Sequence, residues 1–168
     1  TYTLWVIKSN GCGLERLTYA SAPAVYFPVW SPDEKRLVYT NPDSSPSLMD
    51  VVKSWHEQSP KPVVVPPELG ARFHVWSWSP DGRKLAGALL KADGVSVVGV
   101  GIYSLESERL ERLPEFGYNP VWLRDNRRLL LQDHRGKLYV LDSQPGSRRE
   151  ISSLAPHSIT GVTLSQDN

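Results

Sequence analysis

Short stretches of aromatic and β-branched residues recur along the chain, and in several of them apolar and polar positions alternate. Leu37 and Tyr39 would share one face of a strand, and Leu129 and Leu131 would do so in a later stretch. A period of two is typical of a strand with one buried face. Residues 104–113 are rich in Glu, Arg and Leu, yet their place in the repeat described next predicts a strand, a turn and a strand. The pattern therefore predicts a chain that is nearly all β.

A turn motif divides the chain into repeats. It reads Trp-Ser-Pro-Asp at residues 30–33 and 78–81, Trp-Leu-Arg-Asp at 122–125 and Leu-Ser-Gln-Asp at 164–167. Proline presets φ in such a turn, and the Asp side chain can accept hydrogen bonds from nearby backbone N–H groups. The spacings between successive aspartates are 48, 44 and 42 residues, which match one propeller blade. The four aspartates are therefore predicted to stabilise turns and not to bind metal: Asp33, Asp81, Asp125 and Asp167.

These repeats predict an all-β fold, a β-propeller of about four blades with four antiparallel strands each. Residues 25–66, 73–114 and 118–152 are predicted blades, the first with a long, proline-rich connection. Residues 1–18 would supply the two outer strands of a blade, and residues 157–168 would begin a further one. Strand counting favours a larger ring of six to eight blades over four blades that close on themselves. Further sequence, or self-association with a second copy of the chain, would complete that ring.

Composition and charge narrow the range of partners. The chain is 40% hydrophobic and 22% charged, which is typical of a folded domain. Lys and Arg number 19 against 18 Asp and Glu, so no strong field favours nucleic acid. No apolar run approaches the ~20 residues of a membrane span, and we expect no membrane insertion. The chain begins at Thr1 without a signal-peptide pattern, so we expect it to be processed or part of a longer protein.

The sequence lacks the motifs of common catalytic and metal centres. Its four histidines have no zinc-ligand spacing, and there is no Gly-x-Ser-x-Gly element of a serine hydrolase. The glycines of residues 94–101 lie within a strand pattern and are not followed by a predicted helix, so they do not predict a phosphate-binding loop. We therefore predict that this segment has no catalytic residues, no metal site and no cofactor.

One group of residues is a candidate ligand site. Tyr26, His74, Tyr118 and Thr160 each lie seven residues before a motif aspartate, at the start of a predicted innermost strand. Equal positions in successive blades would place them around one mouth of the central channel, with Phe27, Asn119 and Arg72 nearby. Aromatic and imidazole rings at such a mouth are suited to a protein, a peptide or a small ligand. Packing at the strand ends is the alternative interpretation.

The six tryptophans fall into two classes. Trp30, Trp78 and Trp122 occupy equivalent positions, which predicts packing between adjacent blades. Trp5, Trp55 and Trp76 break that register. Of these three, Trp76 and Trp55 are the candidates for contact with a partner, and Trp76 joins the candidate ligand site.

The motifs also carry a family resemblance. The Trp-Ser-Pro-Asp copies resemble the propeller repeat of the TolB family, and residues 4–18 resemble the outer half of that repeat. Residues 101–168 are similar to the propeller regions that follow bacterial serine/threonine kinase domains. Leu123 and Arg124 depart from the family pattern, which has Ser-Pro there. The resemblance implies a radial array of blades that contacts proteins or senses ligands, and an extracytoplasmic, periplasmic location.

We therefore expect a non-catalytic propeller scaffold that binds a protein or ligand, such as the sensor region of a larger receptor or bacterial kinase. The alternative is a propeller that gates a prolyl oligopeptidase-like hydrolase. A third interpretation is a structural segment with no activity of its own. A neighbouring kinase or hydrolase domain in a longer gene would distinguish the first two.

Overall fold

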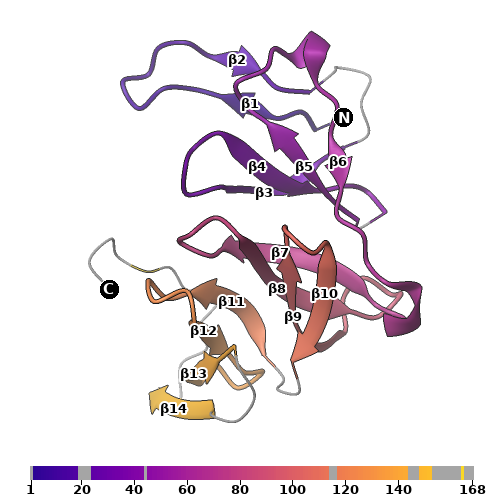
Figure 1. Ribbon diagram of the computed structural model, residues 1–168, viewed down its shortest axis with the longest axis vertical. Coiled ribbons are helices and arrows are strands. Elements are labelled where there is room, and N and C mark those ends of the chain that lie inside the picture. Colours follow the sequence, from indigo (N-terminus) through magenta and orange to yellow (C-terminus); the bar gives the residue numbers. More distant parts are fainter. Residues whose placement is uncertain are drawn as a thin grey trace.

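Successive antiparallel sheets make up the computed structural model, which describes residues 2–18, 24–43, 45–113, 117–143, 148–152 and 164 (Figure 1). The elements, in chain order, are β1 (Trp5–Val6), β2 (Glu15–Arg16), β3 (Tyr26–Trp30), β4 (Arg36–Thr40), β5 (Pro46–Asp50), η1 (Trp55–Glu57), β6 (Lys61–Pro62), η2 (Pro67–Leu69), β7 (Arg72–Trp78), β8 (Lys84–Leu90), β9 (Val97–Ser104), β10 (Arg109–Leu113), β11 (Tyr118–Trp122), β12 (Arg128–Gln132), β13 (Leu138–Asp142) and β14 (Arg148–Ser152). The two short helices are single 3₁₀ turns.

The strands group into blades in the order of the sequence. Blade 1 contains β1 and β2, blade 2 contains β3 to β6, blade 3 contains β7 to β10 and blade 4 contains β11 to β14. Within each blade every strand pairs antiparallel with the next one along the chain. This confirms the predicted all-β propeller architecture. The strand, turn and strand predicted over residues 104–113 are also confirmed, since β9 ends at Ser104 and β10 begins at Arg109.

Blade 2 has the long, irregular connection that its prolines predict. The chain between β5 and β7 passes through η1, the two-residue strand β6 and η2. The outer strand of this blade is only two residues long, Lys61–Pro62. Val63 follows that strand, is buried, and donates its backbone N–H to the oxygen of Pro46 at 2.9 Å. The short edge strand is typical of a sheet rim that proline and lysine protect.

The hydrophobic core lies between adjacent blades. One cluster joins Val38 and Val63 of blade 2 to Phe73 and its neighbours in blade 3. A second joins blade 3 to blade 4, and a third joins the hairpin of blade 1 to Leu37 and Met49 of blade 2. Burying one such Leu, Val or Phe side chain contributes about 1.5–3 kcal/mol, so the stability of each blade depends on its neighbours.

Direct hydrogen bonds cross these blade interfaces. Trp78 Nε1 of blade 3 donates to the backbone oxygen of Val29 in blade 2 at 3.2 Å. Ser77 Oγ donates to the backbone oxygen of Pro120 in blade 4 at 2.7 Å. Trp78 and Trp122 are buried, as expected for packing between blades. These bonds fix the innermost strands of neighbouring blades relative to one another.

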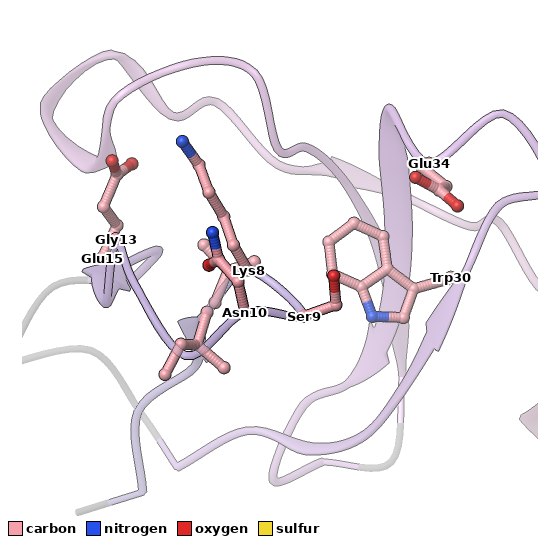
Figure 2. A pocket seen from close by; sticks show the side chains of 9 residues that line it. Lys8, Ser9, Asn10, Gly13, Glu15, Trp30 and Glu34 are labelled. Carbon is pink, nitrogen blue, oxygen red and sulfur yellow. The ribbon is translucent and has the colours of Figure 1, made fainter.

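Trp30 departs from the prediction for its register. The equivalent Trp78 and Trp122 are only 6% and 4% exposed, whereas Trp30 is 44% exposed. Its ring borders a groove between the β1–β2 hairpin and the first turn of blade 2 (Figure 2). The reason is that blade 1, within the described residues, contributes only two strands to this interface.

The motif aspartates stabilise turns, as predicted. Asp33 Oδ1 accepts from Ser31 Oγ at 2.6 Å and from the N–H of Lys35 at 3.2 Å. Asp81 Oδ1 has the same pair of interactions, from Ser79 Oγ at 2.6 Å and from the N–H of Arg83 at 3.0 Å. The fourth aspartate, Asp167, lies outside the described residues.

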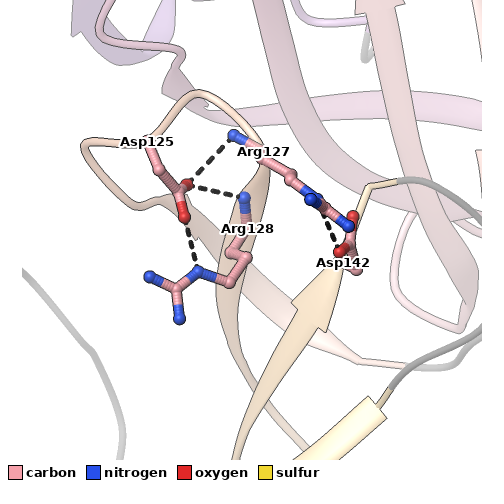
Figure 3. A network of polar contacts seen from close by, with 4 residues as sticks. All are labelled: Asp125, Arg127, Arg128 and Asp142. Carbon is pink, nitrogen blue, oxygen red and sulfur yellow. Dashed lines mark hydrogen bonds and ion pairs between the residues drawn. The ribbon is translucent and has the colours of Figure 1, made fainter.

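The turn of blade 4 lacks this serine, and arginine residues donate hydrogen bonds to its aspartate (Figure 3). Asp125 Oδ1 accepts from the N–H groups of Arg127 at 3.0 Å and Arg128 at 2.9 Å. Arg128 Nε donates to Asp125 Oδ2 at 2.5 Å, and Arg127 Nε donates to Asp142 Oδ2 at 2.8 Å. The departure of residues 123 and 124 from the repeat pattern therefore leaves the turn intact.

Candidate binding surface on the inner strands

Each complete blade carries a bulge in its innermost strand. In β3 and β11 the pairing register shifts between Tyr26 and Val29 and between Tyr118 and Val121. In β7 it shifts between Val75 and Ser77, so Trp76 is the inserted residue. Bulges bend a strand and redirect its side chains, and they often lie beside functional sites.

The bulges of blades 2 and 3 bring a group of rings together, here called the aromatic cluster: Tyr2, Tyr26, Phe27, His74 and Trp76. The ring centroids of Phe27 and His74 are 4.5 Å apart, and those of His74 and Trp76 are 5.0 Å apart. Tyr26 lies 6.3 Å from Phe27, and Tyr2 lies 5.6 Å from Tyr26. Phe27 and Trp76 are also in contact, with centroids 6.2 Å apart, so the exposed rings form a continuous row from blade 2 to blade 3 with His74 beside it.

Exposure sets this row apart from the blade interfaces. Tyr2, Tyr26, Phe27 and Trp76 all remain exposed, and Phe27 is 53% exposed. Large aromatic side chains usually contribute to a core, and a contiguous exposed group of them marks an interaction surface. The aromatic cluster is therefore the strongest candidate for a binding surface among the described residues.

Phe27 adopts a backbone conformation that is rare for its residue type. Its φ is +51°, in the left-handed region, where a bulky side chain is strained. Asn119 holds the equivalent place in blade 4 with a φ of +50°, and asparagine tolerates that region. The bulges of blades 2 and 4 share this conformation, and in blade 2 the chain places a phenylalanine there. Strain of this kind is typical of binding sites.

His74 is the half-buried member of the cluster. Burial lowers the pKa of its imidazole below the usual value of 6.5, so the ring is neutral at pH 7. Its Nε2 atom is buried without a hydrogen-bond partner in the described part of the chain. An unpaired buried polar atom costs about 1–3 kcal/mol, so the site retains a second unfavourable feature beside the strained Phe27.

The structure places the sequence-predicted residues as follows. Tyr26, His74 and Tyr118 occupy one register, because they pair with Thr40, Ala88 and Gln132, each 14 residues later. Ring contacts join Tyr26, His74 and Trp76 through Phe27. Tyr118 is half-buried at the start of β11, one blade further on. That these residues line one channel mouth remains a prediction, and Thr160 lies outside the described residues.

Two features of the cluster were missed by sequence reasoning. Tyr2 precedes the first repeat and carries no motif, so nothing local indicates its contact with Tyr26. Phe27 was expected near the channel mouth, but nothing in the sequence indicates its left-handed backbone conformation, with φ +51°. The other surface candidate, Trp55, has no ring contact with the cluster among the described residues. Its ring contacts that of His56 in a tilted arrangement, with centroids 3.4 Å apart, and lies under the guanidinium of Arg16 at 4.3 Å.

The described residues contain no group of three or more His, Cys, Asp or Glu side chains placed to hold a metal ion. None of the helices in the described ranges is long and apolar enough to span a membrane.

Comparison with known proteins supports the architecture. No family model and no curated protein matches the chain. Among solved structures, the crystal structure of TolB from Acinetobacter baumannii matches 90% of this chain with a TM-score of 0.67 and 17% sequence identity. The match spans only 38% of the TolB chain. An identity this low relates the folds alone, and on that ground the chain has a TolB-like β-propeller fold.

Proposed function

We propose that this chain is a non-catalytic propeller scaffold that binds a protein partner through an extended peptide segment laid across the aromatic cluster. The observation that carries the proposal is the row of exposed rings centred on the strained Phe27. Such strain is retained where the exposed side chain has a function that a better-tolerated residue would not perform.

The spacing of the rings favours a peptide as the ligand. Successive centroids in the exposed row lie 5.6 Å (Tyr2 to Tyr26), 6.3 Å (Tyr26 to Phe27) and 6.2 Å (Phe27 to Trp76) apart. Alternate side chains of an extended peptide project from one face about 6.6 Å apart, so successive side chains would meet successive rings. The neutral His74 adds no charge, which favours apolar, aromatic or proline side chains in the ligand.

In a longer protein the same surface would serve as a sensor region, and the resemblance to kinase-associated propellers supports that role. Tyr118 and Thr160 would extend the surface around the channel mouth. An extracytoplasmic location and a receptor context belong to this proposal. Gating of a hydrolase remains the alternative, and identification of the neighbouring domain would decide between them.

The test uses a displayed library of random 12-residue peptides selected on the intact chain. Enriched peptides are then synthesised and measured by isothermal titration calorimetry against the parent, Phe27→Ala and Trp76→Ala. We expect each substitution to weaken binding at least tenfold, because each removes a large exposed anchor. Trp5→Ala is the matched control, since Trp5 is an exposed tryptophan outside the cluster, and it should leave the affinity unchanged.

Two results would overturn the proposal. One is the absence of any peptide that the chain binds saturably. The other is a set of binding peptides whose affinity is the same in Phe27→Ala, Trp76→Ala and the parent. Thermal unfolding of each variant separates a lost contact from a lost fold.

A further inference from the structure

One side chain joins the motif turns of blades 3 and 4. The backbone N–H of Asp81, in the turn of blade 3, donates to the side-chain oxygen of Asn126, in the turn of blade 4, at 2.8 Å. Asn126 has a φ of +56°, in the left-handed region, which asparagine tolerates. Its carboxamide therefore satisfies a turn N–H of the preceding blade.

The turns of blades 2 and 3 lack this bond. Gly82 holds the place of Asn126 in the turn of blade 3, one residue after the motif aspartate, and its φ of +71° lies in the same region. Because glycine has no side chain, nothing corresponds to the carboxamide. The N–H of Asp33, which is the counterpart in blade 2 of the Asp81 N–H, has no hydrogen-bond partner in the described part of the chain. Asp33 is exposed, so a ligand can reach this donor.

A pocket lies where the missing side chain would be. It has a volume of about 250 Å³ and is lined by residues of both turns: Pro32, Asp33, Arg36, Pro80, Asp81 and Gly82. A Cβ added to Gly82 would lie 3.9 Å from Pro32 Cδ, an ordinary van der Waals contact. The space between the two turns therefore has room for a small polar group.

The groups around the pocket favour a carboxamide over a charged group. The Asp33 N–H requires an acceptor, and an ammonium group has none. The carboxylates of Asp33 and Asp81 outnumber the one guanidinium, that of Arg36, so the local field opposes a second anion. A carboxamide supplies a neutral oxygen acceptor for the N–H and two donors for the carboxylates. Asn126 meets the same requirement at the next interface.

We propose that this pocket binds the carboxamide side chain of an asparagine or glutamine presented by a protein partner. The carboxamide oxygen accepts from the Asp33 N–H, as Asn126 does from Asp81, and its N–H groups face the carboxylates of the two turns. The pocket lies at the end of β3 opposite to Tyr26. This site is therefore separate from the aromatic cluster and does not depend on the function proposed for it.

The probe is N-acetyl-asparagine methylamide, titrated into the ¹⁵N-labelled intact chain and followed by nuclear magnetic resonance. We expect the Asp33 amide to shift saturably, whereas the Asp81 amide, which is already bonded to Asn126, does not respond. N-acetyl-aspartate methylamide is the matched control, because it has the same shape and carries a negative charge. It should bind about fivefold more weakly.

Two substitutions exchange the states of the two turns. Gly82→Asn should fill the pocket from within the chain, abolish the response of Asp33 to the probe and slow hydrogen exchange of the Asp33 amide about fivefold. Asn126→Gly should open the equivalent place in blade 4, so that the Asp81 amide shifts with the probe as Asp33 does in the parent. Thermal unfolding of both variants checks that the fold is retained.

Three results would overturn the proposal. The first is the absence of a saturable shift at Asp33, and the second is equal binding of the asparagine and aspartate probes. The third is a response of Asp33 that persists in Gly82→Asn, because the probe would then bind elsewhere. If Gly82→Asn does not fold, the Asn126→Gly variant decides, and an Asp81 amide that stays unresponsive there contradicts the proposal.

Discussion

Blades 3 and 4 fill one position of the repeat in opposite ways. In blade 3 a large residue, Phe73, precedes the inner strand bulge, and a small residue, Gly87, faces it from the second strand. In blade 4 the equivalent residues are the small Gly117 and the large Leu131. Phe73 and Leu131 are both fully buried. Blades 3 and 4 therefore each place one large and one small residue in the space shared by these two strands, but on opposite strands.

The two glycines nevertheless differ in which atoms a side chain at their position would meet. A Cβ on Gly87 would collide with the backbone oxygen of His74 and lie 2.7 Å from Phe73 Cε2. A Cβ on Gly117 would meet Leu131 Cδ1 at 2.5 Å, and that methyl group ends a flexible side chain. Blade 3 is therefore constrained by its backbone, and blade 4 by a side chain that can move.

The largest expected effect is a direct test of this difference. Gly87→Ala should lower the free energy of unfolding by about 3 kcal/mol, because the bulged backbone of β7 cannot retreat without losing its pairing. Gly117→Ala should cost about 1 kcal/mol, since Leu131 can change rotamer. Urea unfolding of both variants measures the two values.

Gly99→Ala is the control within blade 3, because its Cβ would approach only the flexible side chain of Arg112, at 3.1 Å. Equal losses for Gly87→Ala and Gly117→Ala would show that the two blades are confined in the same way. The distinction between backbone and side-chain constraint would then be wrong.

The second-largest expected effect concerns the bulges of blades 2 and 4. Phe27→Asn, which introduces the residue found at position 119, should raise the free energy of unfolding by about 0.5 kcal/mol. The strain at φ +51° is relieved, and the exposed Phe27 ring contributes little burial in exchange. The reciprocal Asn119→Phe should lower the free energy of unfolding by about 1 kcal/mol. Both values are measured by urea unfolding.

Measuring peptide binding by the Phe27→Asn variant completes the test. If Phe27 is retained for a ligand, Phe27→Asn gains stability while losing affinity for selected peptides. A variant that is less stable than the parent would show that Phe27 contributes to packing. The functional interpretation of its strain would then lose its basis.

Much of the fold was predictable because the turn motif repeats. Pro32 and Asp33, and their copies, specify local turns. Equal offsets from them predict one register for Tyr26, His74 and Tyr118, and the strand pairing shows that register. Those features depend on a few neighbouring residues, which sequence reasoning handles well.

The candidate site was less predictable, because it depends on contacts between blades. No local signal places a left-handed conformation at Phe27, since phenylalanine disfavours it. The exposure of Trp30 follows from what lies beside it, and its own motif is identical to that around Trp78. The need for glycine at position 87 arises from the bulge in β7, which the sequence does not mark.

A third, smaller effect is the pH dependence that His74 gives to blade 3. Burial lowers its pKa in the folded chain below the usual 6.5, so the unfolded chain binds more protons between the two values. The contribution of His74 to stability is therefore complete above about pH 6.5 and declines as the pH falls toward the folded pKa. Urea unfolding at pH 7.5 and pH 5.0 measures the loss.

His74→Tyr is the matched variant, because tyrosine occupies the equivalent place in blades 2 and 4. It should remove this part of the pH dependence while the other histidines are unchanged. A loss between pH 7.5 and pH 5.0 that is equal in the parent and the variant would assign the effect to a group outside the cluster.

The smallest effect contrasts the second hairpins of blades 3 and 4. Asp93, between β8 and β9, is exposed and accepts from Ser96 Oγ at 2.6 Å and from two backbone N–H groups. These hydrogen bonds lower the pKa of Asp93 to about 2. A carboxylate with a lowered pKa stabilises the fold above its unfolded value, near 3.8, and loses that contribution as the pH falls through the folded value.

Asp133, between β12 and β13, is the buried counterpart. Burial opposes its ionisation, but hydrogen bonds from the N–H groups of Lys137 and Arg135 prevail and lower its pKa.

We expect the melting temperature of the parent to fall between pH 4 and pH 2. Asp93→Asn should make that fall smaller while nearly preserving the melting temperature at pH 7. Asp133→Asn should lower the melting temperature already at pH 7, because a buried carboxylate satisfied by N–H donors loses more when its charge is removed. If Asp93→Asn lowers the melting temperature at pH 7 as much as Asp133→Asn does, exposure does not distinguish the two hairpins, and the contrast between them fails.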